Sequence, residues 1–226
     1  MRTTPDALML FAAGFGTRMG ELTRNRPKPL VEVAGRPLLD HALDLVRAAG
    51  MGRIVANTHY LGAQIEAHLA GSEVLISDES DEILETGGGL RKALPLLGAG
   101  PVFTLNTDAI WTGPNVIQTL RAAWDPNRMD ALLALIPPEN AVGHRGSGDF
   151  SCDAEGRLSR GPGHVYSGAQ IVNPAGIETI PGKSFSLNLL WDRMISQGRL
   201  FGVVHSGGWC DVGRPESIPL AEAMIG

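Results

Sequence analysis

The amino-acid sequence predicts an α/β fold, a doubly wound, mostly parallel sheet with an inserted β-hairpin region over the pocket. Short apolar runs with β character recur along the chain, and helical patterns stand between them. The runs are Ala7–Ala13, Arg53–Asn57, Glu73–Ser77, Val102–Leu105 and Ala131–Ile136. Parallel neighbours need crossover connections, and right-handed crossovers place helices on both faces of the sheet. Ligands are then expected at the carboxyl ends of the strands.

Helical spacing marks the segments between these runs. In the first segment Pro37 sits early and Gly50 follows as a left-handed C-terminal cap. The apolar residues that recur at helical spacing between them are Leu39, Ala42, Leu43 and Val46. Further helices are predicted at Leu61–Leu69, Gly88–Leu97, Asn115–Ala123 and Leu187–Ser196, with a last one from near Pro215 through Met224.

A change of composition predicts the insertion. From Pro137 to Gly168 the chain is rich in Gly, Pro, His and Ser, which is typical of turns and loops. Two short β-like pieces, Phe150–Asp153 and Arg157–Ser159, flank the turn Ala154-Glu155-Gly156. We interpret this region as a hairpin that covers the pocket, within a single domain of residues 1–226.

Composition and charge exclude several classes of protein. A chain of 226 residues with 43% hydrophobic and 19% charged residues can bury one core. The net charge of −5 argues against nucleic-acid or polybasic membrane binding, because both need a broad positive field. The early apolar run is too short to span a bilayer and lacks a signal-peptide layout, so a cytoplasmic location is expected. Two cysteines cannot build a disulfide framework or a four-thiolate zinc site.

A glycine loop with cations behind it follows the first apolar run. Gly14 and Gly16 are followed by Arg18 and Lys28, and glycine lets backbone N–H groups approach phosphate oxygens. The guanidinium and ammonium groups can offset the charge of a triphosphate. A dinucleotide fingerprint needs a third glycine where Met19 stands, and a Walker A loop ends in Gly-Lys-Ser or Gly-Lys-Thr. Both readings are disfavoured, as is a serine hydrolase, because no Gly-x-Ser-x-Gly elbow occurs.

Two aspartates are candidate ligands of a metal ion. Asp108 follows the run Val102–Leu105, and Asp211 lies near another predicted strand end far along the chain. Mg²⁺ takes carboxylate and phosphate oxygens, so two converging aspartates make a partial site that water and substrate complete.

A second glycine-rich segment is a candidate for contact with a nucleobase. Gly87, Gly88 and Gly89 precede a helix predicted at Leu90–Leu97. Without side chains, their backbone can approach a flat base closely. The helix N-terminus is expected to offer free N–H donors to that base.

Together these motifs resemble the sugar-phosphate nucleotidyltransferase family. The loop Ala12-Ala13-Gly14-Phe15-Gly16-Thr17-Arg18-Met19 and the later Pro27-Lys28-Pro29-Leu30 match the family's nucleoside-triphosphate loop. The resemblance extends over nearly the whole chain, through Asn57-Thr58-His59-Tyr60, Glu85-Thr86-Gly87-Gly88-Gly89, Asn106-Thr107-Asp108, Gly148-Asp149-Phe150, Tyr166-Ser167-Gly168 and Trp209-Cys210-Asp211-Val212-Gly213. It implies transfer of a nucleoside monophosphate from a nucleoside triphosphate to a sugar 1-phosphate, with Mg²⁺ and with release of pyrophosphate.

The resemblance also assigns roles to residues of this chain. It implies catalytic roles for Arg18, Lys28 and Asp108, and metal binding by Asp108 and Asp211. The implied nucleotide-binding residues are Ala12, Ala13, Gly14, Gly16, Thr17, Arg18, Lys28, Asn57, Gly87, Gly88 and Asn106. The implied sugar-binding residues are Asp149, Tyr166, Gly168 and Asn188. The expected partners are the two small-molecule substrates, with no nucleic acid and no membrane, and the oligomeric state is left open.

One branch of the family is favoured over the others. The Asn-x-His segment together with Leu84-Glu85-Thr86-Gly87-Gly88-Gly89 resembles the N-acetylmuramate 1-phosphate uridylyltransferases of bacterial cell-wall recycling, with UTP as nucleotide. His144, Arg145 and Arg214 are candidates to bind the lactyl carboxylate of that sugar. The alternatives are a glucose 1-phosphate thymidylyl- or uridylyltransferase, a mannose 1-phosphate guanylyltransferase, and a catalytically inactive nucleotide-binding regulatory paralogue. The chain departs from the family pattern at Glu21 (often proline), Thr107 (commonly glycine) and Arg214 (commonly threonine).

Overall fold

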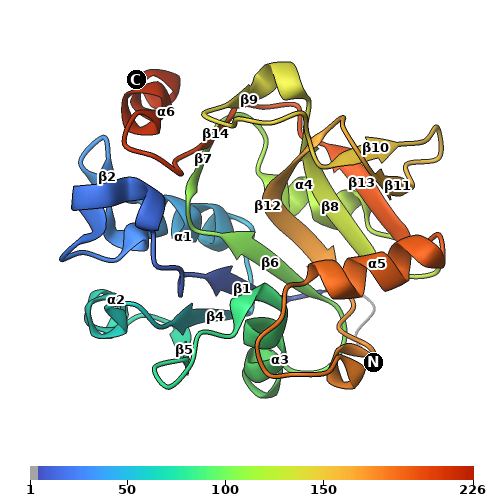
Figure 1. Cartoon of the computed structure of the whole chain (residues 1–226), viewed down its shortest axis with the longest axis horizontal. Coiled ribbons are helices and arrows are strands. Elements are labelled where there is room, and N and C mark those ends of the chain that lie inside the picture. Colours follow the sequence, from blue (N-terminus) through green and yellow to red (C-terminus); the bar gives the residue numbers. More distant parts are fainter. Residues whose placement is uncertain (1–4) are drawn as a thin grey trace.

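A seven-stranded sheet runs through the computed structural model, which describes residues 5–226 (Figure 1). The strands are β1 Ala7–Phe11, β4 Arg53–Thr58, β5 Val74–Asp78, β6 Val102–Asn106, β8 Ala131–Ile136, β12 Val165–Val172 and β13 Leu200–Val204. Their order is β13-β8-β12-β6-β1-β4-β5, and every neighbouring pair is parallel except the two that involve β12. The predicted mostly parallel sheet is therefore confirmed.

Helices cover both faces of this sheet (Figure 1). They are α1 Leu38–Ala48, α2 Gly62–Leu69, α3 Glu85–Leu97, α4 Val116–Ala123 and α5 Asn188–Ser196. Side chains of β1 alternate between the two layers, because Leu8 and Leu10 pack with α1, α2 and α4 while Ala7 and Met9 pack with α3 and α5. A strand buried on both faces reads as a continuous apolar run, and the predicted double winding is confirmed. Within residues 5–226 no helix is long and apolar enough to cross a bilayer.

Sequence patterns do not predict β12 and β13. β12 begins at Val165, so the end of the region interpreted as an insertion up to Gly168 lies in the central sheet. A register shift between Tyr166 and Gln170 interrupts its regular alternation. In β13 a side chain at Gly202 would overlap the side chain of Leu135. Glycine is unfavourable in a strand by propensity, but here close packing against β8 requires it.

The predicted hairpin forms, but it lies against the β13 edge of the sheet. None of its residues lines the pocket at the carboxyl ends of β1, β4 and β6, so its predicted place over the pocket is wrong. β10 (Phe150–Cys152) pairs antiparallel with β11 (Leu158–Arg160), and a bridge joins Arg157 to Phe201 of β13. The remaining short elements are β2 Glu32–Val33, β3 Arg36–Pro37, and the 3₁₀ helices η1 Thr17–Thr23, η2 Lys28–Leu30, η3 Pro138–Asn140 and η4 Ile177–Thr179.

A small three-stranded sheet joins distant parts of the chain beside the central sheet. β7 (Ala109–Trp111) pairs antiparallel with β14 (Trp209–Asp211), which in turn pairs parallel with β9 (Ala141–Val142). The last helix, α6 (Ser217–Ile225), contributes Ala221 to the core behind this sheet. The small sheet therefore fixes the segment around residue 211 next to the segment that leaves β6.

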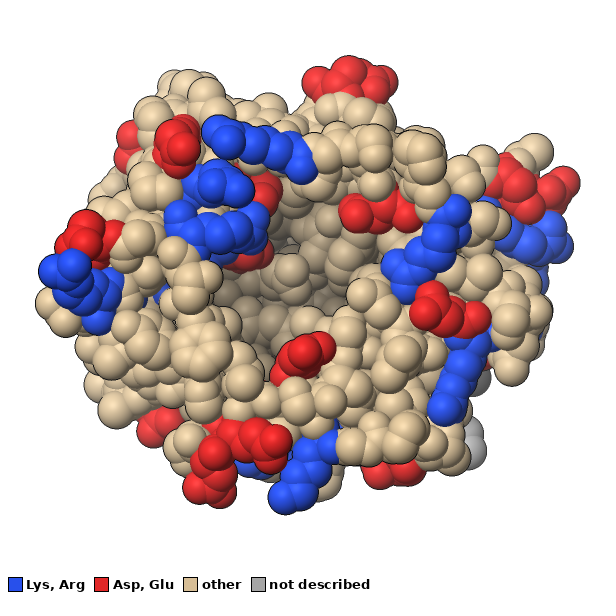
Figure 2. All heavy atoms as spheres, in the orientation of Figure 1, with Lys and Arg blue, Asp and Glu red and all other residues tan. Residues whose placement is uncertain are grey.

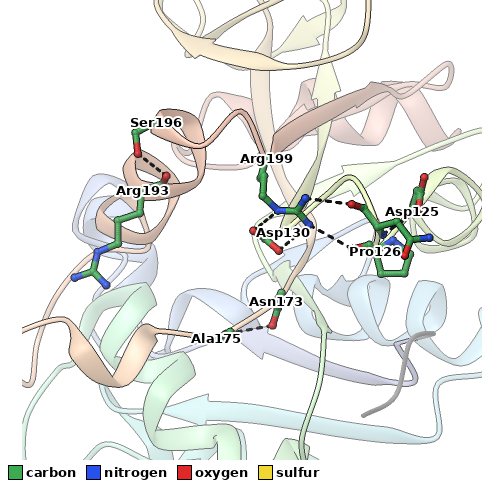
Figure 3. A network of polar contacts seen from close by, with 9 residues as sticks. Asp125, Pro126, Asp130, Asn173, Ala175, Arg193, Ser196 and Arg199 are labelled. Carbon is green, nitrogen blue, oxygen red and sulfur yellow. Dashed lines mark hydrogen bonds and ion pairs between the residues drawn. The ribbon is translucent and has the colours of Figure 1, made fainter.

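An ion-pair network holds the amino ends of β8 and β13 together (Figure 3). The guanidinium of Arg199 donates to both carboxylate oxygens of Asp130, at 2.6 and 3.2 Å, and to the backbone carbonyls of Pro126 and Asn127. The backbone N–H of Asp130 donates back to the carbonyl of Arg199 at 2.9 Å. This network lies at the end of the strands opposite to the ligand-binding edge, so its role is structural.

Candidate active site

A pocket of about 210 Å³ opens where β1, β4 and β6 end. In the space-filling view a deep hollow occupies the middle of this face, and Lys and Arg side chains gather along its left side (Figure 2). Seven residues with predicted roles line the pocket, namely Ala12, Ala13, Gly14, Lys28, Asn57, Asn106 and Asp108. The rest of the lining consists of Phe11, Pro29, Glu79, Ile83, Glu85, Thr86 and Thr107. The carboxyl edge of the sheet thus carries the pocket, as expected for an α/β fold.

The glycine loop presents a run of backbone donors at this edge. Gly16 has a φ of 65°, and a Cβ there would lie 2.8 Å from the Cβ of Lys28. Only glycine allows both the left-handed backbone and this close approach. Among the described groups, none accepts a hydrogen bond from the backbone N–H of Ala13, Gly14, Phe15 or Gly16. Such a run of unpaired N–H groups is suited to bind phosphate oxygens.

Lys28 and Asp108 form an ion pair in the pocket wall. The distance between Lys28 Nζ and Asp108 Oδ2 is 2.6 Å, and the two side chains are 11% and 29% exposed. Lys28 begins η2 between two prolines that restrict its backbone. Thr107, which stands where the family commonly has glycine, donates its hydroxyl to the carbonyl of Phe11 at 2.9 Å. This bond ties the end of β6 to the end of β1 and so helps to place Asp108.

The small sheet brings the second aspartate to the first. Asp211 of β14 pairs with Ala109 of β7, and the backbone N–H of Val212 donates to the carbonyl of Asp108 at 2.8 Å. Burial raises the pKa of Asp211, and the negative charge of Asp108 raises it further, whereas the positive charges of Lys28 and Arg18 lower it. Residues separated by a hundred positions in sequence therefore share one electrostatic site.

Arg18 approaches the same aspartate from the glycine loop. A Cβ placed on Gly213 would lie 3.0 Å from Arg18 Nη1 and 2.9 Å from Asp211 Oδ2. The guanidinium and the carboxylate thus flank Gly213, with Arg18 itself exposed. Thr17, the first residue of η1, is also exposed on this side of the loop. Arg18, Gly16 and Thr17 lie next to the pocket rather than in its lining.

The two aspartates fit a metal ion that substrates help to bind. Within residues 5–226 no group of three or more His, Cys, Asp or Glu side chains could hold a metal by itself. Burial and repulsion by the nearby carboxylate of Asp108 both raise the pKa of Asp211, so the ionised form of Asp211 is disfavoured. A divalent cation would relieve that repulsion. Mg²⁺ commonly takes one or two carboxylates together with substrate phosphates, which is the donor set that this site offers.

A buried relay of hydrogen bonds through Asn57 and Glu79 holds the start of the glycine loop in place. Asn57 Oδ1 accepts from the backbone N–H of Ala12 at 2.8 Å, and Asn57 Nδ2 donates to Glu79 Oε1 at 2.8 Å. The other carboxylate oxygen of Glu79 accepts from the N–H of Leu84 at 3.2 Å. Burial raises the pKa of Glu79. Asn57 thus positions the loop, and Glu79 is a pocket residue that the sequence analysis missed although it follows the end of β5.

The glycine triplet has a different setting from the predicted one. α3 begins at Glu85, so the three glycines lie inside the helix and are buried. The N–H groups of Gly87 and Gly88 both donate to the carbonyl of Phe185, and side chains at these positions would overlap the segment 183–185. The prediction that these groups are free donors is therefore wrong. Neither glycine lines the pocket, and contact of Gly87 and Gly88 with a nucleotide stays a prediction.

Three of the four predicted sugar-binding residues form a separate wall around α5. Asp149 Oδ2 accepts from the backbone N–H of Tyr166 at 2.8 Å, and the ring centroids of Tyr166 and Trp191 lie 4.9 Å apart. Asn188 Oδ1 accepts from Arg160 Nη2 at 3.0 Å. Burial raises the pKa of the Tyr166 phenol well above its usual value. These side chains lie outside the lining of the pocket that holds Lys28.

Gly168, the fourth, packs directly against the pocket residue Asn106. Its φ is 88°, and a Cβ there would lie 2.9 Å from Asn106 Cβ, Cγ and Nδ2. We expect Gly168→Ala to destabilise the protein by roughly 1–3 kcal/mol more than Gly176→Ala, because it adds overpacking to backbone strain. Gly176 is the matched control, since its φ is 82° and a Cβ there would meet nothing within 4 Å. Urea unfolding of the two variants measures the difference, and equal losses would contradict the packing role.

Comparison with known proteins assigns the chain to a family. The family model of the MobA-like NTP transferase domain matches residues 8–144, more than half of the chain. The chain belongs to the MobA-like NTP transferase family. The matched segment of this MobA-like transferase contains the glycine loop, Lys28, the relay through Asn57 and Glu79, and Asp108. Asp211 lies beyond it and joins the site through β14.

Relatives along the whole chain refine this assignment. The MobA-like transferase is 42% identical to the N-acetylmuramate alpha-1-phosphate uridylyltransferase of Caulobacter vibrioides, over the full chain and 99% of that protein. It is 36% identical to the enzyme of the same name from Neisseria meningitidis serogroup B, over 96% of this chain and 97% of that protein. The predicted class, a sugar 1-phosphate nucleotidyltransferase, is therefore confirmed.

A solved structure shows the same fold. The crystal structure of HddC from Yersinia pseudotuberculosis complexed with GMP-PN matches the MobA-like transferase with a TM-score of 0.80, over 97% of this chain and 99% of that chain. The two sequences are 22% identical, so the likeness establishes the fold alone. It confirms the predicted α/β class with its mostly parallel sheet.

Proposed function

We propose that this MobA-like transferase transfers UMP from UTP to N-acetylmuramate 1-phosphate with Mg²⁺, releasing pyrophosphate, in the cytoplasm during bacterial cell-wall recycling. One observation carries the proposal. Next to the free N–H groups of the glycine loop lie two cations and two carboxylates that interact with one another, namely Lys28, Arg18, Asp108 and Asp211. Relatives at 42% and 36% identity that bear the corresponding name support the choice of substrates. A regulatory paralogue without turnover would have no need to keep both cations and both carboxylates.

The proposed reaction is an in-line displacement at phosphorus. A phosphate oxygen of the sugar 1-phosphate attacks the α-phosphorus of UTP, the bond from that phosphorus to the β-bridging oxygen breaks, and pyrophosphate leaves. Loop N–H groups hold the nucleotide phosphates, while Lys28 and Arg18 offset negative charge on the transferred and departing groups. Asp108 and Asp211 would hold Mg²⁺, which would supply positive charge to offset that of the phosphates. No side chain is needed as nucleophile.

A basic side chain near the two aspartates is the proposed contact for the lactyl carboxylate. His144 Nε2 is buried without a hydrogen-bond partner among the described atoms, and the charge of His144 lowers the pKa of Asp211, so the ring lies near the site. Arg145 instead reaches Glu216 at 3.8 Å, and both side chains are largely exposed. Of the three candidates from the sequence, His144 is therefore favoured over Arg145. The side chain of Arg214 is half-buried and forms no hydrogen bond or ion pair with another described residue.

A substrate panel tests the proposed function. Pyrophosphate release is measured with UTP, dTTP and GTP against N-acetylmuramate, glucose and mannose 1-phosphates under matched conditions. We expect UTP with N-acetylmuramate 1-phosphate to give the highest kcat/KM, and His144→Ala to raise KM for this sugar phosphate more than for glucose 1-phosphate. A higher kcat/KM for glucose 1-phosphate with dTTP, or for mannose 1-phosphate with GTP, would replace the substrates and leave the mechanism in place.

A further inference from the structure

Glu85 has a backbone conformation that its side chain does not favour. Among the described residues, the non-glycine positions with positive φ are Ala34, Leu61 and Glu85, with angles of 51°, 51° and 56°. Glycine adopts this left-handed region without strain, whereas a residue with a Cβ loses energy there. The side chain of Glu85 is exposed and forms no hydrogen bond or ion pair with any other described residue. Nothing in the packing of residues 5–226 explains why this position holds glutamate.

The pocket offers an explanation, because Glu85 lies in its lining. The other two carboxylates of the lining are already bonded, Glu79 to Asn57 and Leu84, and Asp108 to Lys28. Next to Glu85, the hydroxyl of Thr86 accepts from the backbone N–H of Leu187 at 3.0 Å, which fixes the start of α3. Glu85 is thus the carboxylate of the described lining with both oxygens unpaired, since Lys28 engages one oxygen of Asp108 and both oxygens of Glu79 are bonded.

Charge decides which part of the substrates can use these oxygens. The triphosphate and the sugar phosphate are anionic, and N-acetylmuramate carries a further carboxylate, so their approach to Glu85 is unfavourable. The nucleoside half of the nucleotide carries neutral donors instead, the ribose hydroxyls and the imide N–H of the base. We propose that Glu85 is a positioning residue that accepts a hydrogen bond from the nucleoside half of the bound nucleotide. This inference rests on the proposed function for the identity of the nucleotide.

Replacement of Glu85 by glycine separates the effect of its carboxylate on binding from the effect of its strained backbone on stability. Glu85→Gly removes the carboxylate and relieves the backbone, so we expect a Tm equal to or above that of the native protein. We also expect the Kd for Mg²⁺–UTP, measured by calorimetry without sugar phosphate, to rise roughly 10- to 100-fold, the range for losing a hydrogen bond to a charged group. Glu85→Gln keeps an acceptor oxygen without the charge, and its Kd should rise by roughly 3- to 10-fold.

Two matched controls isolate the role of the side chain. Ala34→Gly makes the same backbone change at a φ of 51°, at an exposed position outside the pocket lining. Glu82→Gln removes an exposed negative charge three positions before Glu85, also outside the lining. Both should bind Mg²⁺–UTP like the native protein. A rise in Kd with either control as large as that with Glu85→Gly would overturn the assignment.

Two nucleotide analogues identify the donor. 2′-Deoxyuridine triphosphate lacks one ribose hydroxyl, and 3-methyluridine triphosphate lacks the imide N–H. The analogue without the partner of Glu85 should bind native protein about as weakly as UTP binds Glu85→Gly, and it should lose no further affinity in that variant. Native Kd for UTP in a folded Glu85→Gly variant, or a change only in KM for the sugar phosphate, would overturn the inference. Because binding is measured without the sugar phosphate, a failure of the proposed sugar would leave these results unaffected.

Discussion

Asp108→Asn is expected to lower kcat with Mg²⁺ by at least ~10³-fold while the fold stays intact, since a bound metal supplies several kcal/mol of transition-state stabilisation. Asparagine keeps the size of the side chain but removes its charge. Asp108 stands at the end of β6, bonds to Lys28 Nζ at 2.6 Å and raises the pKa of Asp211. Its replacement therefore weakens the proposed metal site and leaves Lys28 without its partner.

Turnover at increasing Mg²⁺ concentration, together with circular dichroism and Tm, measures this effect. Asp81→Asn is the control, because Asp81 is an exposed aspartate outside the pocket lining, and it should behave like the native protein. If Asp108→Asn kept native, Mg²⁺-dependent activity, Asp108 would have no part in metal binding and the site would need other ligands.

The sequence predicts the strands that are buried on both faces. β1, β4, β6 and β8 are continuous apolar runs, and the pattern needs no knowledge of the rest of the fold. The sequence does not predict β12, because Ser167, Gly168 and Gln170 interrupt its apolar pattern. These residues make contacts with other parts of the fold that the local pattern does not show. The hydroxyl of Ser167 donates to the carbonyl of Ala134, Gly168 makes room for Asn106, and Gln170 accepts from the indole of Trp191. Tertiary contacts here override local propensity.

The start of α3 is mispredicted for a related physical reason. Three successive glycines disfavour a helix, so the predicted helix begins within them or after them, at Gly88 or Leu90. In the structure the segment 183–185 packs so closely on the helix that side chains at Gly87 and Gly88 would overlap it. At Gly89 a Cβ would lie 2.7 Å from Glu79 Oε1, so the third glycine makes room for the buried relay. Packing across the chain, which the sequence does not display, stabilises this helix.

Some residues of the candidate site could be predicted from the sequence, and others could not. Residues in contiguous motifs, such as the glycine loop with Lys28, could be predicted because glycine and cations at close spacing have a direct chemical meaning. Glu79 and the side chain of Glu85 receive no role from the sequence, although Glu85 belongs to a recognised motif, because both stand in an acidic stretch from Asp78 to Glu85 that is typical of a solvated loop. The burial of Glu79 and the positive φ of Glu85 distinguish them only in three dimensions.

Lys28→Ala and Arg18→Ala are each expected to lower kcat by ~10²–10³-fold, the loss for removing one electrostatic transition-state contact. The two cations differ in their surroundings. The Lys28 side chain is 11% exposed and paired with Asp108, whereas Arg18 is exposed and acts on Asp211 from across Gly213. Lys28→Ala also leaves two carboxylates without their nearest compensating charge, so it should be the more damaging change at low Mg²⁺.

Conservative variants separate charge from geometry at these positions. Lys28→Arg keeps the charge but brings a larger, planar head group to a side chain that is 11% exposed and already 2.6 Å from Asp108, so it should recover little activity. Arg18 lies in open surroundings, so Arg18→Lys should recover part of kcat. Arg24→Ala is the control, since Arg24 is exposed, pairs with Glu21 and lies outside the pocket lining. If kcat were unchanged in both alanine variants, Lys28 would be only a structural partner of Asp108, and Arg18 would be only a surface charge. The loop N–H groups and the metal would then have to stabilise the departing pyrophosphate.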